Sequence, residues 1–227
     1  RGMTRTLVEI VSWSKFTFFD DYRLYYHAIA GDPSLECDYK KIMVDSTVYA
    51  GYITQENDGS YSIIPAKKDK NKNQFYQVKR EKFGIKSDEQ FMFEKQDNKK
   101  YLVVPGNIDG KVKRVWLINP PDKSAKTISL SDEDIKMYKF DFNRYEDVTN
   151  KDDADKRDGN LLRWLSVSED NIAPCFYTKW KDSRGKDRII FGHTRFFRMP
   201  YKYRRGEYIP KEIQNPDIVD MAECIFG

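Results

Sequence analysis

Apolar residues recur with a helical period at the start of the chain. One stripe of a 3.6-residue repeat contains Met3, Leu7, Ile10, Val11 and Ser14. The pattern predicts a helix over residues 3–14. Arg1 and Arg5 lie off this stripe, so we expect them to face a ligand or solvent.

From residue 48 the pattern changes to short runs rich in Tyr, Ile, Val and Phe, separated by turn signals. A Gly-containing turn at 57–60 separates the first two runs, and 105–110 and 182–185 separate the others in the same way. The runs predict three antiparallel pairs: 48–53 with 61–65, 101–104 with 112–118, and 173–180 with 187–192.

The second half of the chain also contains two segments with helical spacing. Leucines at 161, 162 and 165 predict a helix over 160–169, and a turn at 215–217 precedes a second helix over 217–225. The charged segment 147–159 between them is expected to be a mobile loop, most of all 150–159. An early helix, hairpins and short late helices favour an α+β fold over a doubly wound sheet.

Composition excludes several classes of protein. The 227 residues include 39% hydrophobic and 15% aromatic side chains, which a disordered chain lacks. No apolar run approaches the roughly 18 residues that a membrane span requires, so we predict no membrane partner. Three widely spaced cysteines argue against a disulfide framework or a zinc site and favour a cytoplasmic protein. Without a Gly-rich nucleotide loop or a ligand-spaced cluster, we expect no cofactor and no metal.

Charge is segregated along the chain although the net charge is only +4. Residues 66–82 contain seven basic and two acidic side chains, and 179–205 contain ten basic and two acidic. Residues 129–158 contain ten acidic and six basic. This pattern predicts a basic face and a separate solvated acidic segment, although a single run can also be ordinary hydrated surface.

The stretch 191–201 places cations beside aromatic residues after a predicted strand. Cations hold phosphates, and aromatic rings accept stacked bases. The alternative is that Phe196, Phe197 and Met199 are core and that the arginines are merely exposed. Gly192 either ends the strand or lets the backbone approach a ligand. A second basic place consists of Lys111, Lys113 and Arg114.

Catalysis has weaker support. His193 with Lys202 is the pairing that a metal-independent ribonuclease could use as acid and base. His27, in an aromatic cluster, is interpreted as structural. No motif nominates a nucleophile.

Three stretches together resemble one known family. Residues 1–10 resemble the R-G-M-x-R-x-x-x-E start of the first helix in the RAMP superfamily of CRISPR-associated proteins. Residues 191–201 resemble the F-G-x-T-x-x-F-R-x-P-Y stretch of one type III branch, and 217–227 resemble its D-x-A-E-x-L-F-G segment. The features span nearly the whole chain, and the middle motif is fairly specific.

The resemblance implies an RRM-like (ferredoxin-like) core, in residues 1–47 and 160–227, with a β-rich insertion at 48–159. It also implies a backbone subunit that grips CRISPR RNA in a type III effector complex. Some members cut target RNA with an Asp that would lie upstream of Arg1, so no catalytic residue is carried over. We expect the core to be incomplete at both ends.

The leading hypothesis is an RNA-binding subunit, with CRISPR RNA, target RNA and other subunits as partners. Phosphates would be held by cations, with Phe196, Phe197 or Tyr201 as a stacking face, while guide–target pairing supplies specificity. The candidate RNA-binding residues are Arg1, Arg5, Lys111, Lys113, Arg114, His193, Thr194, Arg195, Phe197, Arg198, Tyr201 and Lys202. The alternatives are a CRISPR RNA-processing endoribonuclease that uses His193, and a protein-interaction module within the complex.

Overall fold

A computed structural model describes residues 2–15, 23–27, 33–44, 48–85, 92–97, 99–104, 113–143, 165, 171–212, 215 and 217–226. Its helices are α1 (Gly2–Val11), α2 (Pro33–Met43), α3 (Asp132–Asn143) and α5 (Met221–Phe226), with 3₁₀ turns η1 (Arg80–Phe83) and η4 (Arg205–Tyr208). Its strands are β1 (Tyr25–Tyr26), β2 (Tyr49–Gln55), β3 (Tyr61–Pro65), β4 (Phe75–Lys79), β5 (Met92–Lys95), β6 (Tyr101–Val104), β7 (Arg114–Ile118), β8 (Ile128–Ser129), β9 (Ile172–Lys181), β10 (Asp187–Gly192) and β11 (Met199–Pro200).

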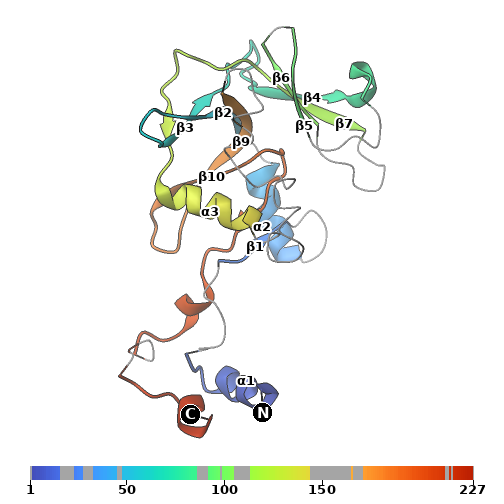
Figure 1. The fold of residues 1–227 in the computed structure, drawn as a ribbon. Helices are drawn as coiled ribbons and strands as arrows, with labels where there is room; N and C mark the ends of the chain where they lie inside the picture. The colour runs from blue at the N-terminus through green and yellow to red at the C-terminus, as the bar shows by residue number, and fades with distance from the viewer. Residues whose placement is uncertain are drawn as a thin grey trace, which may run out of the picture. The chain divides into compact units, whose positions relative to one another are not determined.

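The predicted α+β class is confirmed, with antiparallel sheets and separate helices (Figure 1). The chain forms two compact units. The first contains Arg1–Tyr26, Lys181–Lys186 and Pro200–Gly227, and the second contains His27–Trp180 and Asp187–Met199. These bounds differ from the division expected at 47/48 and 159/160. The physical reason is that β2, from the expected insertion, pairs along its length with β9, from the expected core.

The second unit is built on a five-stranded sheet with the order β10-β9-β2-β3-β8. The predicted hairpin of β2 with β3 is confirmed, with Ile53 opposite Ile63. Gly51 lies where a Cβ would come within 2.7 Å of the Ile63 side chain, so the close pairing requires glycine. The predicted pair of β9 with β10 is confirmed too.

Helix α3 contributes to the core of this sheet. Ser131 and Asp134 form a reciprocal cap: the Ser131 hydroxyl and backbone N–H both donate to the Asp134 carboxylate, at 2.7 and 2.9 Å. Tyr138 stacks on Phe191 with ring centroids 4.6 Å apart, and Ile135 joins the same buried cluster. Within the segment 129–158, expected to be acidic and solvated, Asp132 is exposed, but Asp134 is buried because it caps a helix that packs on β10.

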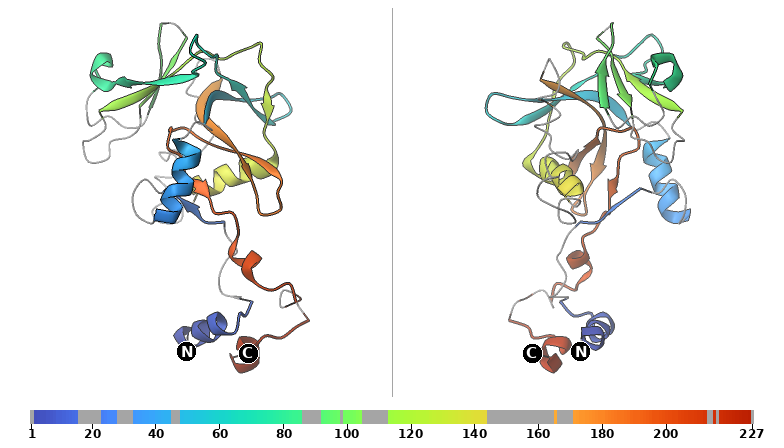
Figure 2. Two further views of the ribbon diagram at one scale, coloured as in Figure 1. Left: turned by 180° about the vertical axis from the view of Figure 1, so that it is seen from behind. Right: turned by 45° about the vertical axis from the view of Figure 1, so that its right-hand side comes forward.

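A four-stranded sheet with the order β4-β7-β6-β5 completes the second unit (Figure 2). The predicted pairing of β6 with β7 is confirmed, and their connection at 105–110 lies outside the described residues. One face of this sheet is a closed core whose buried members are Leu102, Val104, Val115 and Leu117.

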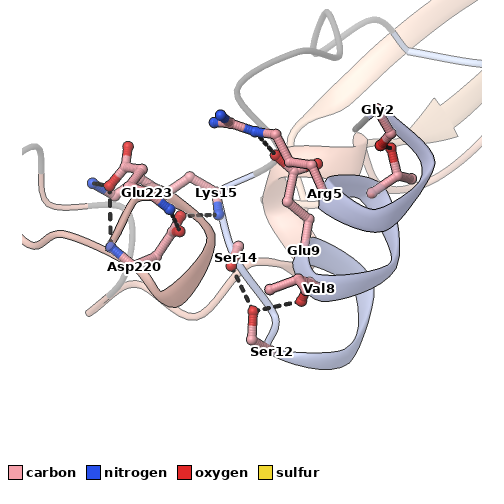
Figure 3. A network of polar contacts seen from close by, with 10 residues as sticks. Gly2, Arg5, Val8, Glu9, Ser12, Ser14, Lys15, Asp220 and Glu223 are labelled. Atoms are coloured by element: carbon pink, nitrogen blue, oxygen red, sulfur yellow. Dashed lines mark hydrogen bonds and ion pairs between the residues drawn. The ribbon is translucent and has the colours of Figure 1, made fainter. Parts of the chain in front are cut away.

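The first unit contains α1 and α5. Helix α1 confirms the first predicted helix, but its apolar stripe faces outward: Met3, Leu7, Ile10 and Val11 are each more than half exposed, whereas Glu9 is buried. Figure 3 shows how Lys15 joins α5, since its backbone N–H donates to Asp220 at 2.9 Å and its ammonium pairs with Glu223 at 3.1 Å.

Two other expectations have a different outcome. The late helix begins at Met221 rather than at 217, because Asp220 accepts from the Glu223 backbone N–H and Glu223 accepts from the Asp220 N–H in a capping box. The expected loop at 147–159 and, apart from the buried and helical Leu165, the expected helix at 160–169 lie outside the described residues.

Candidate nucleic-acid interface

The stretch that the sequence analysis nominated divides between the two units. Residues 193–199 follow β10 in the second unit, whereas Tyr201 and Lys202 belong to the first.

Arg195 carries its charge into a nearly closed site, with only 7% of its surface exposed. The guanidinium carbon lies 5.4 Å from the ring centroid of Phe75 and 5.3 Å from that of Phe196. Its Nη1 lies 4.0 Å from the sulfur of Met43. No carboxylate in the described part of the chain pairs with it.

This environment is electrostatically unusual for an arginine. Burial disfavours the charged form and lowers the pKa of Arg195 to about 10, an effect that the nearby Tyr39 hydroxyl partly opposes. Aromatic faces and a thioether replace only part of the lost hydration. Because a buried cation without a counter-charge is costly, an incoming anion would stabilise it.

Helix α2 supplies one wall of the site. Tyr39 and Met43 are four residues apart, so both lie on one face of the helix, and both are buried. The Tyr39 hydroxyl donates to the carbonyl oxygen of Phe197 at 2.9 Å. This bond ties α2 to the segment after β10 and fixes the tyrosine oxygen near Arg195.

Four aromatic rings supply the other wall. Phe75 of β4 meets Trp116 of β7 edge-on at 5.6 Å and Phe176 of β9 at 5.1 Å, and Trp116 contacts Phe196 at 6.3 Å. Phe176 is buried, Phe75 and Trp116 are half-buried, and Phe196 is 38% exposed. The outer rings thus offer apolar faces beside the Arg195 cation.

Phe197 is core, so its nomination as an RNA-binding residue is wrong. It is 6% exposed, and its Cβ lies 2.5 Å from the point where a side chain on Gly192 would begin. Gly192 ends β10 and makes room for this ring. Of the alternatives that the sequence left open, core is correct for Phe197 and Met199, whereas Phe196 is the exposed ring.

His193 is likewise internal, which contradicts both roles considered for it. It is 3% exposed, with Nδ1 2.9 Å from the Pro174 carbonyl and Nε2 2.8 Å from the Tyr138 hydroxyl. A carbonyl can only accept, so Nδ1 carries the proton and Nε2 accepts from Tyr138. Burial lowers the pKa of His193 to about 4. A neutral ring with both nitrogens engaged neither holds a phosphate nor exchanges protons with a substrate.

The remaining nominated residues of the second unit lie nearer the surface. Thr194 and Arg198 are half-buried. Partial burial, together with the charge of Arg198, lowers the pKa of His27. Lys113 and Arg114 are exposed at the start of β7, where Arg114 Nη1 donates to Gln77 Oε1 at 2.8 Å. Lys111 lies outside the described residues.

In the first unit, Arg5 differs from the expectation that it faces a ligand or solvent. Its Nε donates to Glu9 at 3.1 Å, and its side chain is largely covered (Figure 3). The ring of Tyr201 packs on Tyr26 at 4.9 Å. Lys202 is exposed, with its ammonium 5.5 Å from the Tyr203 ring centroid. Arg1 lies outside the described residues.

The residues that surround Arg195 were not predicted from the sequence. Phe75 comes from β4, which was not predicted, and Trp116 comes from β7, whose pairing with β4 was not predicted. Tyr39 and Met43 come from an unpredicted helix. Pro33 at the first helical position and Lys40 and Lys41 in the last turn were available signals for α2. No local signal places these side chains around a residue near position 195.

The described residues contain no group of three or more His, Cys, Asp or Glu that could hold a metal ion. None of the helices in the described ranges has the length and apolar character needed to cross a bilayer. No family model matches the sequence, no curated protein matches it, and no solved structure matches the fold.

Proposed function

We propose that the protein is an RNA-binding subunit of a type III CRISPR effector complex, which grips CRISPR RNA and its duplex with target RNA in antiviral defence. The motif resemblance at 1–10, 191–201 and 217–227 supports the class and, with it, a ferredoxin-like RAMP core and a cytoplasmic location. RNA binding itself is carried by one observation: the buried Arg195 cation, which has no carboxylate partner among the described residues, lies beside the exposed ring of Phe196.

The chemistry of this site suits a phosphate with a neighbouring base. A phosphate supplies the negative charge that Arg195 lacks, and the planar guanidinium matches phosphate geometry. An adjacent aromatic ring stacks a base without regard to its identity. Sequence specificity would then come from pairing between guide and target.

The test is equilibrium binding of labelled CRISPR-repeat RNA to the full chain across a salt series. If about four phosphates are neutralised, log K falls with log salt at a slope near −3 for single-stranded RNA. Arg195→Met is expected to weaken binding by about tenfold or more, whereas Lys136→Ala, at an exposed position on α3, leaves it unchanged. Absence of salt-dependent RNA binding would overturn the proposal.

The endoribonuclease alternative has less support, because both nitrogens of His193 have hydrogen-bond partners inside the core. Cleavage of repeat RNA in EDTA that disappears in His193→Ala while the protein stays folded would restore it.

A protein-interaction module in the same complex is favoured by a different observation, the outward apolar stripe of α1. Exposed apolar patches of this kind mark contacts with other proteins. In that case Leu7→Asp should abolish association with a neighbouring subunit, and the isolated chain should bind no RNA.

A further inference from the structure

The four-stranded sheet has one covered face and one partly open face. Residues of one strand alternate between faces, so the buried Val115 and Leu117 point to the core while Arg114 and Trp116 point away from it. The register places Trp116 opposite Gln77 and Arg114 opposite Lys79. These residues therefore share the face that continues to Phe75.

Two cations lie at the open end of this face. Lys79 and Arg114 are directly opposite each other in the register, both are exposed, and neither forms an ion pair with another described residue. Like charges in opposite positions on a sheet repel each other. The hydrogen bond from Arg114 to Gln77 orients the guanidinium along the face but does not neutralise it.

A third cation lies at the other end of the same face. Phe75 lies on the same face of β4 as Gln77 and Lys79, and the Arg195 guanidinium packs over its ring. Lys79 and Phe75 are about 13 Å apart at 3.3 Å per residue. The order along the face is therefore cation pair, Trp116, and then Phe196 with the buried cation.

We infer that this face, formed by Phe75, Gln77, Lys79, Arg114, Trp116, Arg195 and Phe196, binds a single-stranded segment of RNA with at least one base unstacked against Trp116 or Phe196. The inference rests on the proposed RNA-binding function and gives it a substrate class and a location. Phosphates bind at the two ends, where no described residue supplies the cations with a counter-charge, and the aromatic rings between them stack on bases. Paired bases in a duplex are stacked on each other and present their edges, so a duplex leaves these rings unused.

The experiment compares two probes on the full chain. One is a labelled oligouridylate of about ten nucleotides, within the range of single-strand site sizes, and the other is an RNA hairpin of equal phosphate number. We expect the single strand to bind at least about tenfold more tightly and to quench tryptophan fluorescence. The quenching should be lost in Trp116→Leu.

Three variants separate the contributions. Trp116→Leu and Phe196→Ala should each weaken single-strand binding by about 5- to 150-fold, the range for loss of one stacked base. Because Phe196 is partly exposed, its variant keeps the test usable if Trp116→Leu fails to fold. Lys79→Ala with Arg114→Ala should flatten the salt slope by about 1.4, at 0.7 per phosphate, whereas Lys136→Ala should leave it unchanged.

The outcomes distinguish the inference from the proposed function. Equal affinity for strand and hairpin, with no effect of Trp116→Leu or Phe196→Ala, overturns the inference but leaves RNA binding in place. Competition by polyglutamate as strong as that of the oligouridylate overturns it in favour of an acidic protein segment. No binding of either RNA overturns both.

Discussion

At the scale of single residues, the unusual group is Arg195. Buried arginines in proteins are generally paired, because a buried charge without a counter-charge loses its hydration and gains no compensating interaction. Burial lowers the pKa of Arg195 to about 10, which corresponds to a penalty of about 3 kcal/mol on the charged form. Two ring contacts offset part of this at about 0.5–2 kcal/mol each.

Arg195→Met therefore separates binding from stability. The free energy of unfolding should stay the same or rise by up to about 2 kcal/mol, since an apolar chain of similar length replaces a buried cation that has no carboxylate partner in the described part of the chain, while RNA affinity falls. Urea unfolding followed by circular dichroism measures the first quantity, with Lys136→Met as the control. A loss of more than about 1 kcal/mol would show that Arg195 is held for structural reasons.

His193 makes stability depend on pH. Its pKa is lowered from 6.5 in the unfolded chain to about 4 in the fold, so between these values the unfolded state binds more protons. Stability is fully present above pH 6.5 and falls as pH decreases towards 4, by about 2 kcal/mol at pH 5. Thermal melting across this window should show the fall in the native protein and a flatter profile in His193→Asn. Equal profiles for native protein and His193→Asn would contradict the neutral buried ring.

At the scale of elements, the sequence pattern predicts strands that have alternating residues or clear turn signals at their ends. It does not predict which strands pair with each other when that depends on register across the sheet. The hairpin of β2 and β3 follows from the Gly59 turn and the apolar runs around it. Strand β4 and the capped helix α3 were missed, although Ser131 and Asp134 have capping-box spacing. Helix α1 has the predicted period, but its stripe is exposed, because an apolar period fixes which residues share a face and not what covers that face.

The end of β10 offers a test of the packing. In Gly192→Ala the new Cβ would lie 2.5 Å from the Cβ of Phe197, so the backbone or the ring must move. We expect a loss of about 1–3 kcal/mol in the free energy of unfolding. Gly2→Ala is the matched control, because nothing lies within 4 Å of its Cβ position and alanine favours a helix. Equal stability of the two variants would show that Phe197 does not pack on Gly192.

At the scale of the whole molecule, two basic runs that are far apart in sequence meet at one site. The run at 66–82 contributes Phe75 and Lys79, and the run at 179–205 contributes Arg195 and Phe196. Charge segregation along the chain predicts a basic face. It does not predict that aromatic rings bring the runs at 66–82 and 179–205 together. Periodicity cannot reveal such a contact, because it depends on the pairing of β4 with β7 and on the ring of Phe176 beneath them.

The same limit applies to the nominated site. From the sequence, Arg195 and Arg114 were predicted in two separate basic segments, and Phe196 was predicted as a stacking face. The predicted site also included Phe197 and His193, since nothing local distinguishes an exposed aromatic from a buried one in a strand end of this composition. Only burial in the fold distinguishes them: the ring of Phe196 is exposed, whereas that of Phe197 is buried against Gly192.

The most direct test of the central claim, that RNA lies on the Arg195 face of the second unit, is ultraviolet cross-linking of bound RNA followed by peptide mapping. Aromatic side chains against which bases stack are well placed to cross-link. The expected adducts are on Trp116 and Phe196, and they should disappear when excess unlabelled single strand is added. Adducts confined to residues 201–211 of the first unit, with none on Trp116 or Phe196, would contradict the claim.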